Sequence, residues 1–359
     1  MPKVLFIANG HGEDVIAASI IKELQVISQD VDVYGLPMVG VGLALSSLPN
    51  VSIIGPQKEM RSGGFIKSVV SLWHDLWAGL IGLHFRQIKN ATKHKYELVV
   101  AVGDFFPYIL ALLFLRPSKL VLISTAKSDL FEPHFFLERL FFRIFQTLVI
   151  TRDQITADNL SASKVMNEYL GNVMMDLVPE ANSIIEKQGT VVGILPGSRF
   201  EAYNNFRLIM KVVKNLPRDW HYICAVPDTI RVEQLDLLAV KVDFVSFAQL
   251  VNSSDLVIGL AGTANEQCIG KGVPVFCFPG TGPQTTRKRF RDQNKLLKGL
   301  TQFIDSTDSA IIAKRIEKLA ATAAFCDHVN VLGPKVMGSA GGSKKIAEEI
   351  RCILESLSM

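Results

Sequence analysis

Two stretches in the second half of the chain read VGILPGSR (Val192 to Arg199) and IGLAGTANEQ (Ile258 to Gln267). Each has the pattern of a buried strand, a tight glycine turn and the start of a helix. Such a turn presents unpaired backbone N–H groups at a helix N-terminus, where a phosphate can bind. Two such turns in one half of the chain, the first with an arginine in it, predict a diphosphate held between neighbouring βα units.

Strand-like runs alternate with helical ones through most of the chain, and this alternation predicts an α/β protein. Most of the runs are short and apolar without strict alternation, as expected of parallel strands covered on both faces. The first series comprises Lys3–Ala8, Val31–Gly35, Val51–Ile54, Leu98–Val102, Lys119–Ser124 and Thr147–Ile150, and the second comprises Thr190–Leu195, His221–Val226, Val242–Phe244, Leu256–Gly259 and Pro274–Phe278. Helices expected at Val15–Val26, Phe206–Asn215 and Asn265–Gly270 have suitable lengths for crossovers. We therefore expect two Rossmann-like, doubly wound parallel-sheet domains in tandem.

The length of 359 residues suits two such domains better than one. We expect the first domain over residues 1–170 and the second over residues 171–340, because a polar stretch separates the two strand series. A last helix is expected from Ser343 to Leu357, after the glycine-rich residues 338–342, so that residues 341–359 form a segment of their own.

The composition argues against several classes of protein. Hydrophobic residues make up 48% of the chain. A membrane span needs about 20 residues with few charges, and the longest apolar run, residues 98–115, contains Asp104 and Pro107. We therefore expect no membrane span. The first residues show a strand pattern rather than a signal peptide, so we expect a cytoplasmic protein. The five cysteines and seven histidines show no ligand spacing, so no metal is expected.

The net charge of +4 is mild, and one basic cluster stands out. Arg287, Lys288, Arg289 and Arg291 follow a glycine loop that comes directly after an expected strand. A run of this kind is commonly a solvated helix face, but its position also fits an anionic partner. Because the run is short and lacks interleaved aromatic residues, no nucleic acid is expected as a partner.

The first βα turn, residues 9–14, places a histidine and two carboxylates at the carboxyl end of a strand. Doubly wound sheets bind ligands at that edge. His11 is a candidate general base, since the pKa of histidine lies near neutral pH. A structural alternative has Asp14 capping the helix and His11 supporting the turn. The third glycine of the dehydrogenase fingerprint is absent.

A further carboxylate, Asp104, follows the expected strand Leu98–Val102 and Gly103 directly. It is a second candidate base, or a group that binds the acceptor of a transfer reaction. Its structural alternative is the cap of the next helix. Residues 124–129, at the end of the following strand, are a weaker candidate for the lining of the same site.

Two aromatic segments mark the first half of the chain. The stretch Phe65–Ile88 is expected to form a long amphipathic helix carrying Trp73 and Trp77, and Phe131–Phe145 is rich in phenylalanine. Either they face the core as ordinary crossover elements, or their aromatic side chains contact lipid. The second interpretation predicts a peripheral protein on the cytoplasmic face of a membrane.

The sequence LPGSR, residues 195–199, resembles the sugar-nucleotide loop of lipid-A-disaccharide synthases. The sequence AGTA, residues 261–264, together with Val273–Val275, resembles their second donor motif. The first turn and the Gly103–Asp104 strand end resemble the family more loosely. The resemblance covers most of the chain in order, and its closest fit is a divergent branch described as lipid-A-disaccharide-synthase-related.

This resemblance implies a GT-B glycosyltransferase, in which two Rossmann-like domains face a central cleft. The C-terminal domain would hold a UDP-sugar and the N-terminal domain the acceptor, and the last helix would cross back to the N-terminal domain. Carried over to this sequence, the donor-binding residues are Gly197, Ser198, Arg199, Gly262 and Thr263, and the acceptor-side residues are Gly10, Gly12 and Glu13. No metal or other cofactor is implied, because arginine side chains and helix dipoles neutralise the leaving diphosphate in GT-B enzymes.

The chain departs from the family at one donor position. A glutamate seven residues before the proline of the second motif commonly meets the nucleotide ribose, and here that position holds Gln267, with Glu266 one residue earlier. One residue on a helix corresponds to about 100° of rotation, so the two side chains cannot face the ribose equally. Either Glu266 reaches the ribose through a local shift, or Gln267 replaces it.

The leading hypothesis is transfer of a hexose-type sugar from a UDP-sugar to a lipid acceptor. His11 or Asp104 would deprotonate the acceptor hydroxyl, while Arg199 and the Gly262 turn would stabilise the departing UDP. Two alternatives stay open: a UDP-sugar 2-epimerase of the same fold, and a nucleotide-sugar or lipid-binding protein without turnover, which the displaced glutamate supports. No particular oligomer is predicted.

Overall fold

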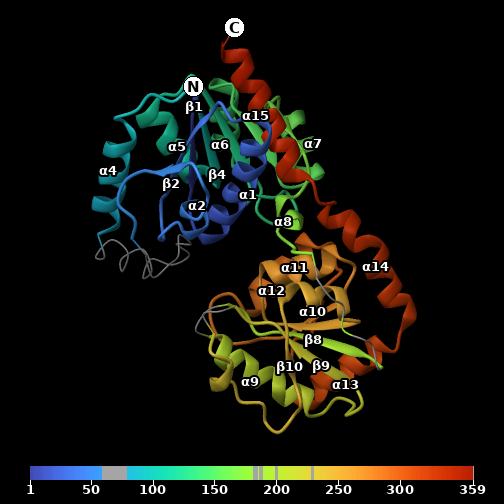
Figure 1. Cartoon of the computed structure of the whole chain (residues 1–359). Helices are drawn as coiled ribbons and strands as arrows, with labels where there is room; N and C mark the ends of the chain where they lie inside the picture. Colours follow the sequence, from blue (N-terminus) through green and yellow to red (C-terminus); the bar gives the residue numbers. More distant parts are fainter. Residues whose placement is uncertain (59–78, 181–184, 186–188, 199–200, 228–229, 359) are drawn as a thin grey trace. The chain divides into compact units, whose positions relative to one another are not determined.

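The computed structural model describes residues 1–58, 79–180, 185, 189–198, 201–227 and 230–358 (Figure 1). The chain divides into two compact units. Unit 1 comprises Met1–Leu177 together with Ala340–Met359, and unit 2 comprises Val178–Ser339.

Unit 1 contains a seven-stranded parallel sheet in the order β3-β2-β1-β4-β5-β6-β7. Its strands are β1 (Lys3–Ala8), β2 (Asp32–Pro37), β3 (Val51–Ile53), β4 (Leu98–Gly103), β5 (Lys119–Ser124), β6 (Leu148–Thr151) and β7 (Asn167–Glu168). Successive side chains of a strand point to opposite faces. In β1, Val4, Phe6 and Ala8 accordingly pack into one core and Leu5 and Ile7 into the other. The continuous apolar runs are thus explained by burial on both faces.

Helices cover both faces of this sheet. They are α1 (His11–Ile27), α2 (Leu43–Ser46), α4 (Leu80–Ala91), α5 (Phe105–Leu110), the π-helical segment η1 (Ala111–Leu115), α6 (Phe136–Ile144), α7 (Gln154–Ala162), α8 (Val173–Asp176) and α15 (Gly342–Ser358). One core joins the sheet to α1, α8 and α15, and the other joins it to α4, α5 and α6.

The prediction of one continuous helix over Phe65–Ile88 is wrong at Gly79. Gly79 has φ of +88°, in the left-handed region, and α4 begins only at Leu80. The expected helix cannot run through Gly79, and its first part falls on residues 59–78, which lie outside the described ranges.

The C-terminal helix α15 belongs to unit 1. Its residues Ile346, Ala347 and Ile350 pack into the same core as α1. The Asp176 carboxylate at the end of α8 accepts hydrogen bonds from the backbone N–H groups of Gly341 and, at 2.6 Å, of Ser343. A single side chain therefore fixes the start of α15 where the chain returns to unit 1.

Unit 2 contains a six-stranded parallel sheet in the order β10-β9-β8-β11-β12-β13. Its strands are β8 (Val191–Leu195), β9 (His221–Cys224), β10 (Asp243–Phe244), β11 (Leu256–Gly259), β12 (Val275–Cys277) and β13 (Gln302–Phe303). Its helices are α9 (Ala202–Val213), the 3-10 helix η2 (Val232–Gln234), α10 (Phe247–Ser253), α11 (Thr263–Gly270), α12 (Arg287–Leu296), α13 (Ser309–Ala320) and α14 (Ala323–Met337). The predicted pair of doubly wound parallel sheets is confirmed. Strands β7 and β13, of two residues each, are missing from the prediction.

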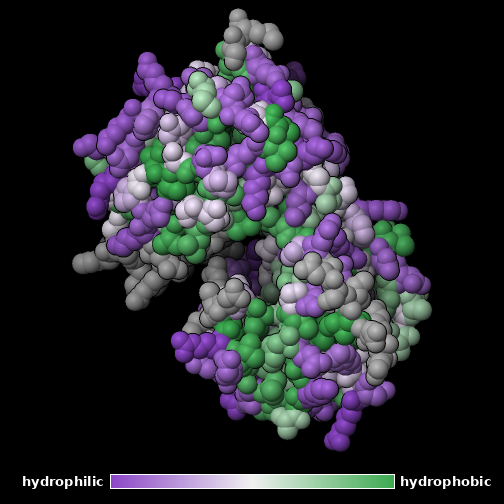
Figure 2. Space-filling view, viewed as in Figure 1, coloured by the Kyte–Doolittle hydropathy of each residue, from purple (hydrophilic) through white to green (hydrophobic). Residues whose placement is uncertain are grey.

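Hydrophobic side chains also reach the surface of unit 1 (Figure 2). The exposed ones on or beside α4, η1 and α6 are Ile81, Phe85, Leu113, Phe114, Phe135, Phe136, Leu137, Ile144 and Phe145, here called the exposed apolar residues of unit 1. Among the described helices, none has the length and apolar character that a bilayer crossing requires.

Candidate functional site

Each sheet reverses its strand order at one place. In unit 1 this switch point lies between β1 and β4, and in unit 2 it lies between β8 and β11. Ligands of doubly wound sheets bind outside the carboxyl ends of the two strands at such a point. Gly10 follows β1 and Asp104 follows β4, while Gly197 follows β8 and Gly262 follows β11. The structure thus places these four residues, all selected from the sequence, at the two switch points.

At the switch point of unit 1, α1 begins immediately after Gly10, whose extended backbone precedes the first turn. His11 is the first residue of α1, but its side chain lies outside what the structure describes. Gly12 is exposed and Glu13 is buried. Since α1 starts at His11, Asp14 is its fourth residue, so the alternative in which Asp14 caps the helix is wrong.

Gly103 brings the end of β4 against the first turn of α1. Its φ is +128°, and a Cβ built on it would lie 3.2 Å from Cγ of Glu13. Any other residue would therefore strain the backbone and crowd the Glu13 side chain. The next residue, Asp104, caps α5, because its Oδ1 accepts a hydrogen bond of 2.9 Å from the N–H of Phe106. The capping role expected as an alternative is confirmed, and the carboxylate still lies at the switch point.

The three carboxyl groups of this switch point all have raised pKa values. Burial raises the pKa of Glu13. A backbone hydrogen bond lowers this pKa in part, and the nearby negative charge of Asp104 raises it further. Burial also raises the pKa of Asp104, although the Phe106 N–H and the Lys127 ammonium oppose it. The pKa of Asp14 rises to about 7, through burial first and the charge of Glu13 second. Carboxyl groups of this kind exchange protons closer to neutral pH than ordinary ones.

A buried network lies beside Asp104, at the end of the neighbouring strand β5. The Lys127 ammonium lies 3.7 Å from Oε1 of Glu138, and the other oxygen of Glu138 lies 3.0 Å from Nδ1 of His134. Nε2 of His134 is hydrogen-bonded to Oγ of Ser124 at 3.0 Å. Burial alone would raise the pKa of Glu138, but the hydrogen bond with His134 and the charge of Lys127 together lower it.

This network holds α6 against β5 and places a cation near the switch point. Sequence reasoning included Lys127 in the weaker segment 124–129 but missed His134 and Glu138. His134 lies just before α6 and Glu138 in its first turn, so the contact depends on where the helix begins, which the sequence alone does not indicate.

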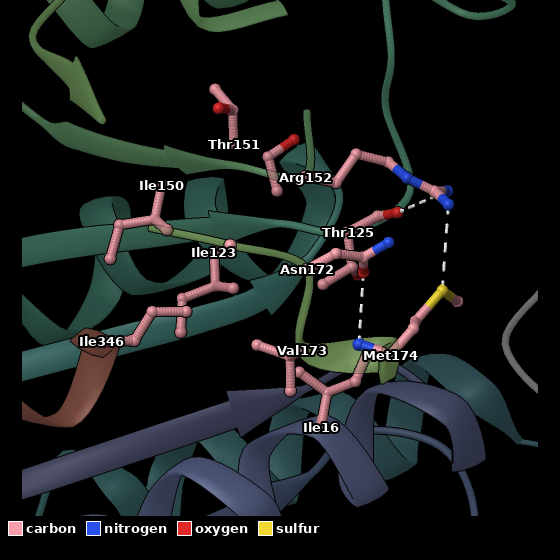
Figure 3. Close-up of a pocket in the computed structure, with 12 residues that line it drawn as sticks. Ile16, Ile123, Thr125, Ile150, Thr151, Arg152, Asn172, Val173, Met174 and Ile346 are labelled. Atoms are coloured by element: carbon pink, nitrogen blue, oxygen red, sulfur yellow. Dashed lines mark hydrogen bonds between the residues drawn. The ribbon is translucent and has the colours of Figure 1, made fainter. Parts of the chain in front are cut away.

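A small cavity lies at the carboxyl ends of β5 and β6, bordered by α1, α8 and α15 (Figure 3). It contains about 310 Å³ of empty space, open solvent included, with room inside for roughly one or two water molecules. Arg152 donates hydrogen bonds to the Thr125 carbonyl at 3.3 Å and to the Met174 sulfur at 3.8 Å. Its small volume leaves no room for a sugar, and the Arg152 side chain in its wall is held by two other lining residues.

At the switch point of unit 2, the turns after β8 and β11 lie side by side. The Leu260 N–H donates to the Leu195 carbonyl at 2.8 Å. Gly197 has φ of +101°, and a Cβ there would lie 3.1 Å from the carbonyl oxygen of Leu260. Ser198 is exposed next to it, and Arg199 lies outside the described residues. Only glycine lets the first turn pass this close to the second turn.

The second turn leaves open space in front of helix α11. Gly262 precedes the helix, Thr263 is its exposed first residue, and a Cβ built on Gly262 would meet nothing within 4 Å. This geometry, a glycine turn before a helix N-terminus with free room in front, suits a bound phosphate group.

Glu266 and Gln267, the two candidates for the ribose, are 4% and 6% exposed. Glu266 accepts a hydrogen bond of 3.3 Å from Nε2 of Gln293 on α12, and the same nitrogen donates to the Gly262 carbonyl at 2.9 Å. Gln293 thus connects α12 to the turn and to the helix behind it. No pattern in the sequence indicates this role of Gln293, because its partners lie about thirty residues away.

Asn205, buried on α9, performs a similar role on the other side of the turns. Its Oδ1 accepts hydrogen bonds from the N–H and hydroxyl of Thr281 at 2.8 and 2.9 Å, and its Nδ2 donates to the Pro196 carbonyl at 3.3 Å. The loop between β12 and α12 is therefore fixed against the turn that follows β8. Across the described residues, no group of three or more His, Cys, Asp or Glu side chains is arranged to hold a metal ion.

No protein-family model matches the chain, and no curated protein matches it in sequence. Solved structures, however, match it over nearly its whole length. The calicheamicin glycosyltransferase CalG4 matches with a TM-score of 0.70 at 13% identity, covering 99% of this chain and 98% of that chain. A UDP-N-acetylglucosamine 2-epimerase matches with a TM-score of 0.60 at 14% identity, covering 99% and 97%.

A third match is UGT2 of Phytolacca americana in complex with UDP-2-fluoro-glucose and pterostilbene. Its TM-score is 0.58 at 12% identity, and the match covers 100% of both chains. At identities this low the likeness concerns the fold alone. The expected GT-B fold, two parallel-sheet α/β domains, is thereby confirmed, and it is a fold shared by glycosyltransferases and epimerases.

Proposed function

We propose that this chain is a metal-independent glycosyltransferase that moves a sugar from a UDP-sugar to a lipid or lipid-like acceptor, in the manner of lipid-A-disaccharide synthases. The observation that carries the proposal is the position of the two glycine turns. Both lie at the switch point of unit 2, packed side by side, with open space before a helix N-terminus. That is where a doubly wound sheet binds the phosphates of a nucleotide.

On the donor side, the backbones at Gly197 and Gly262 and the side chains of Ser198 and Thr263 would bind the diphosphate. Arg199 would supply positive charge, as the sequence predicts. Glu266 or Gln267 would meet the ribose. The contact with Gln293, which also bonds the Gly262 carbonyl, supports Glu266 as the residue whose side chain lies at the turn.

On the acceptor side, His11 or Asp104 would take the proton from the acceptor hydroxyl as the new glycosidic bond forms. The buried Glu13 would lie beside them, and Gly10 and Gly12 would leave room for the acceptor. The position of Asp104 at the switch point of unit 1 supports this assignment, because the carboxylate is fixed by its bond to the Phe106 N–H.

The lipid character of the acceptor is supported by the exposed apolar residues of unit 1. Phe136 is 77% exposed on α6, and Phe85 is 68% exposed on α4. Both helices pack against the same face of the sheet, and exposed cations such as Arg86 and Arg143 lie on the same two helices. Exposed aromatic side chains flanked by cations suit the surface of an anionic membrane, so we propose peripheral contact with its cytoplasmic face.

A UDP-sugar 2-epimerase is the second candidate, and one observation favours it. An epimerase needs acid and base groups close to the sugar, and unit 1 brings together three carboxyl groups with raised pKa values, Glu13, Asp14 and Asp104. A solved epimerase also matches the whole chain in fold.

Product analysis separates the two functions. The purified chain is incubated with UDP-N-acetylglucosamine in D₂O, with and without membrane lipids, and the products are identified by mass spectrometry. A glycolipid formed only when lipid is present supports transfer. A deuterium-labelled epimer formed without lipid would instead assign the epimerase function and refute the transferase.

A further inference from the structure

The first turn of α12 contains an arginine that differs from the other arginines of its helix. Arg287 and Arg291 are hydrogen-bonded to Asp305 at 2.6 and 2.7 Å, and their side chains are 54% and 61% exposed. They form an ordinary surface ion-pair cluster. Arg289 is partly buried, its Nε is shut off from solvent, and this nitrogen has no hydrogen-bond partner in the described part of the chain.

An unpaired guanidinium N–H inside a protein is unfavourable, and such groups are nearly always satisfied in native structures. A guanidinium also presents two parallel donors, which match two oxygens of a phosphate. The buried Nε of Arg289 is therefore one of two neighbouring N–H donors that together suit an anion.

Arg289 lies on the side of α12 that faces the Gly262 turn. Gln293, one helical turn later, donates from its side chain to the Gly262 carbonyl at 2.9 Å and to Oε1 of Glu266 at 3.3 Å. Residues four apart lie on the same face of a helix, and their side chains lean toward the helix N-terminus. The side chain of Arg289 consequently lies beyond Gln293, toward the carboxyl edge of the sheet.

The loop that leads into α12 adjoins the same site. Asn205 bonds both Thr281 of this loop and the Pro196 carbonyl of the turn after β8. The turns after β8, β11 and β12 are thus fixed to one another by Asn205 and Gln293. Arg289 lies in the first turn of α12, which begins at Arg287 after the third of these turns, where the basic cluster follows a glycine loop in the sequence.

We propose that Arg289 binds the diphosphate of the nucleotide donor at the Gly262 turn, through a two-pronged contact from its guanidinium. The inference rests on the proposed function and names a cation of the same donor site. It gives the basic cluster two separate roles, with Arg287 and Arg291 in a surface ion-pair cluster and Arg289 in the site.

Calorimetric titration with UDP, uridine and inorganic pyrophosphate tests this inference on the full chain. The variant is Arg289→Gln, and the matched control is Arg291→Gln, which removes the same charge from the same helix. Arg289→Gln should weaken UDP and pyrophosphate binding about tenfold or more and leave uridine binding unchanged, whereas Arg291→Gln should change UDP binding less than about twofold. Arg289→Lys, which keeps the charge but loses the fork, should give an intermediate affinity.

The outcomes distinguish this inference from the function on which it rests. Equal UDP affinity in the wild type and in Arg289→Gln would overturn the role of Arg289 while the donor site stands. An equal loss of uridine and UDP binding would also overturn it, since that result indicates a structural role. Binding of pyrophosphate that depends on Arg289, with no binding of UDP, would support the anion site and refute the UDP-sugar function.

Discussion

Replacing Asp14 with asparagine should remove a cost to stability that the wild-type chain carries at neutral pH. Asp14 is 1% exposed, and neither of its carboxyl oxygens has a hydrogen-bond partner among the described residues. Burial, followed by the negative charge of Glu13, raises its pKa from 3.8 to about 7. A group in this position favours its neutral form, which asparagine imitates permanently.

The sign and size of the effect follow from proton uptake. Between about pH 4 and about pH 7 the folded chain keeps a proton on Asp14 that the unfolded chain has released, so the free energy of unfolding falls as the pH rises. One pKa unit corresponds to about 1.4 kcal/mol, so a rise from 3.8 to about 7 amounts to roughly 4 kcal/mol. Asp14→Asn should therefore match the wild type near pH 4 and exceed it by up to roughly 4 kcal/mol at pH 8.

Urea unfolding followed by circular dichroism at a series of pH values between about 4 and about 8 measures this difference. Asp30→Asn, which removes an exposed carboxyl just beyond the end of α1, is the control for a general change in charge. Parallel stability profiles of the wild type and Asp14→Asn over the whole range would refute the argument, because they would show that the pKa of Asp14 is the same in the folded and unfolded chains.

Three further predictions concern the proposed sites. Gly197→Ala, which puts a Cβ 3.1 Å from a backbone carbonyl at φ of +101°, should weaken UDP binding about tenfold; Gly299→Ala has a similar φ of +87° with open space around it, and should leave UDP affinity unchanged. Asp104→Asn should lower turnover by about 10²- to 10⁴-fold and leave UDP binding and helix capping intact, so wild-type turnover would exclude Asp104 as the base. Phe136→Ser should reduce flotation of the protein with anionic liposomes, whereas Val331→Ser, an exposed apolar residue of unit 2, should not; equal flotation of both variants would argue against membrane contact through α6.

Most of the fold is predictable from the sequence because its strands are buried on both faces. Runs such as Leu98–Val102 and Leu256–Gly259 are apolar at every position, and glycine or a polar residue marks the end of each. The positions of the glycine turns follow from the same pattern. The order of the strands in the sheet is harder to predict from the sequence. It is this order, with β8 next to β11, that brings the turns of Gly197 and Gly262 together.

The contacts that complete the candidate sites are less predictable. Asn205, Gln293 and Glu138 act through partners on other elements, and a single polar residue on an amphipathic helix gives no sign of such a partner. Asp14 was open to interpretation as a cap because Ser, Thr, Asp and Asn are typical there. The structure starts α1 at His11, four residues before the expected Val15, so the Asp14 carboxyl is buried in the first turn instead.

The central claim is that the switch point of unit 2 binds a UDP-sugar, and nucleotide binding to the full chain tests it most directly. Calorimetry with UDP, ADP and GDP is performed on the wild type and on Arg199→Ala. The account predicts that the wild type binds UDP in preference to ADP and GDP, and that the variant loses most of this affinity. Failure of the wild type to bind any of the three nucleotides would contradict the account and leave the two glycine turns without a ligand.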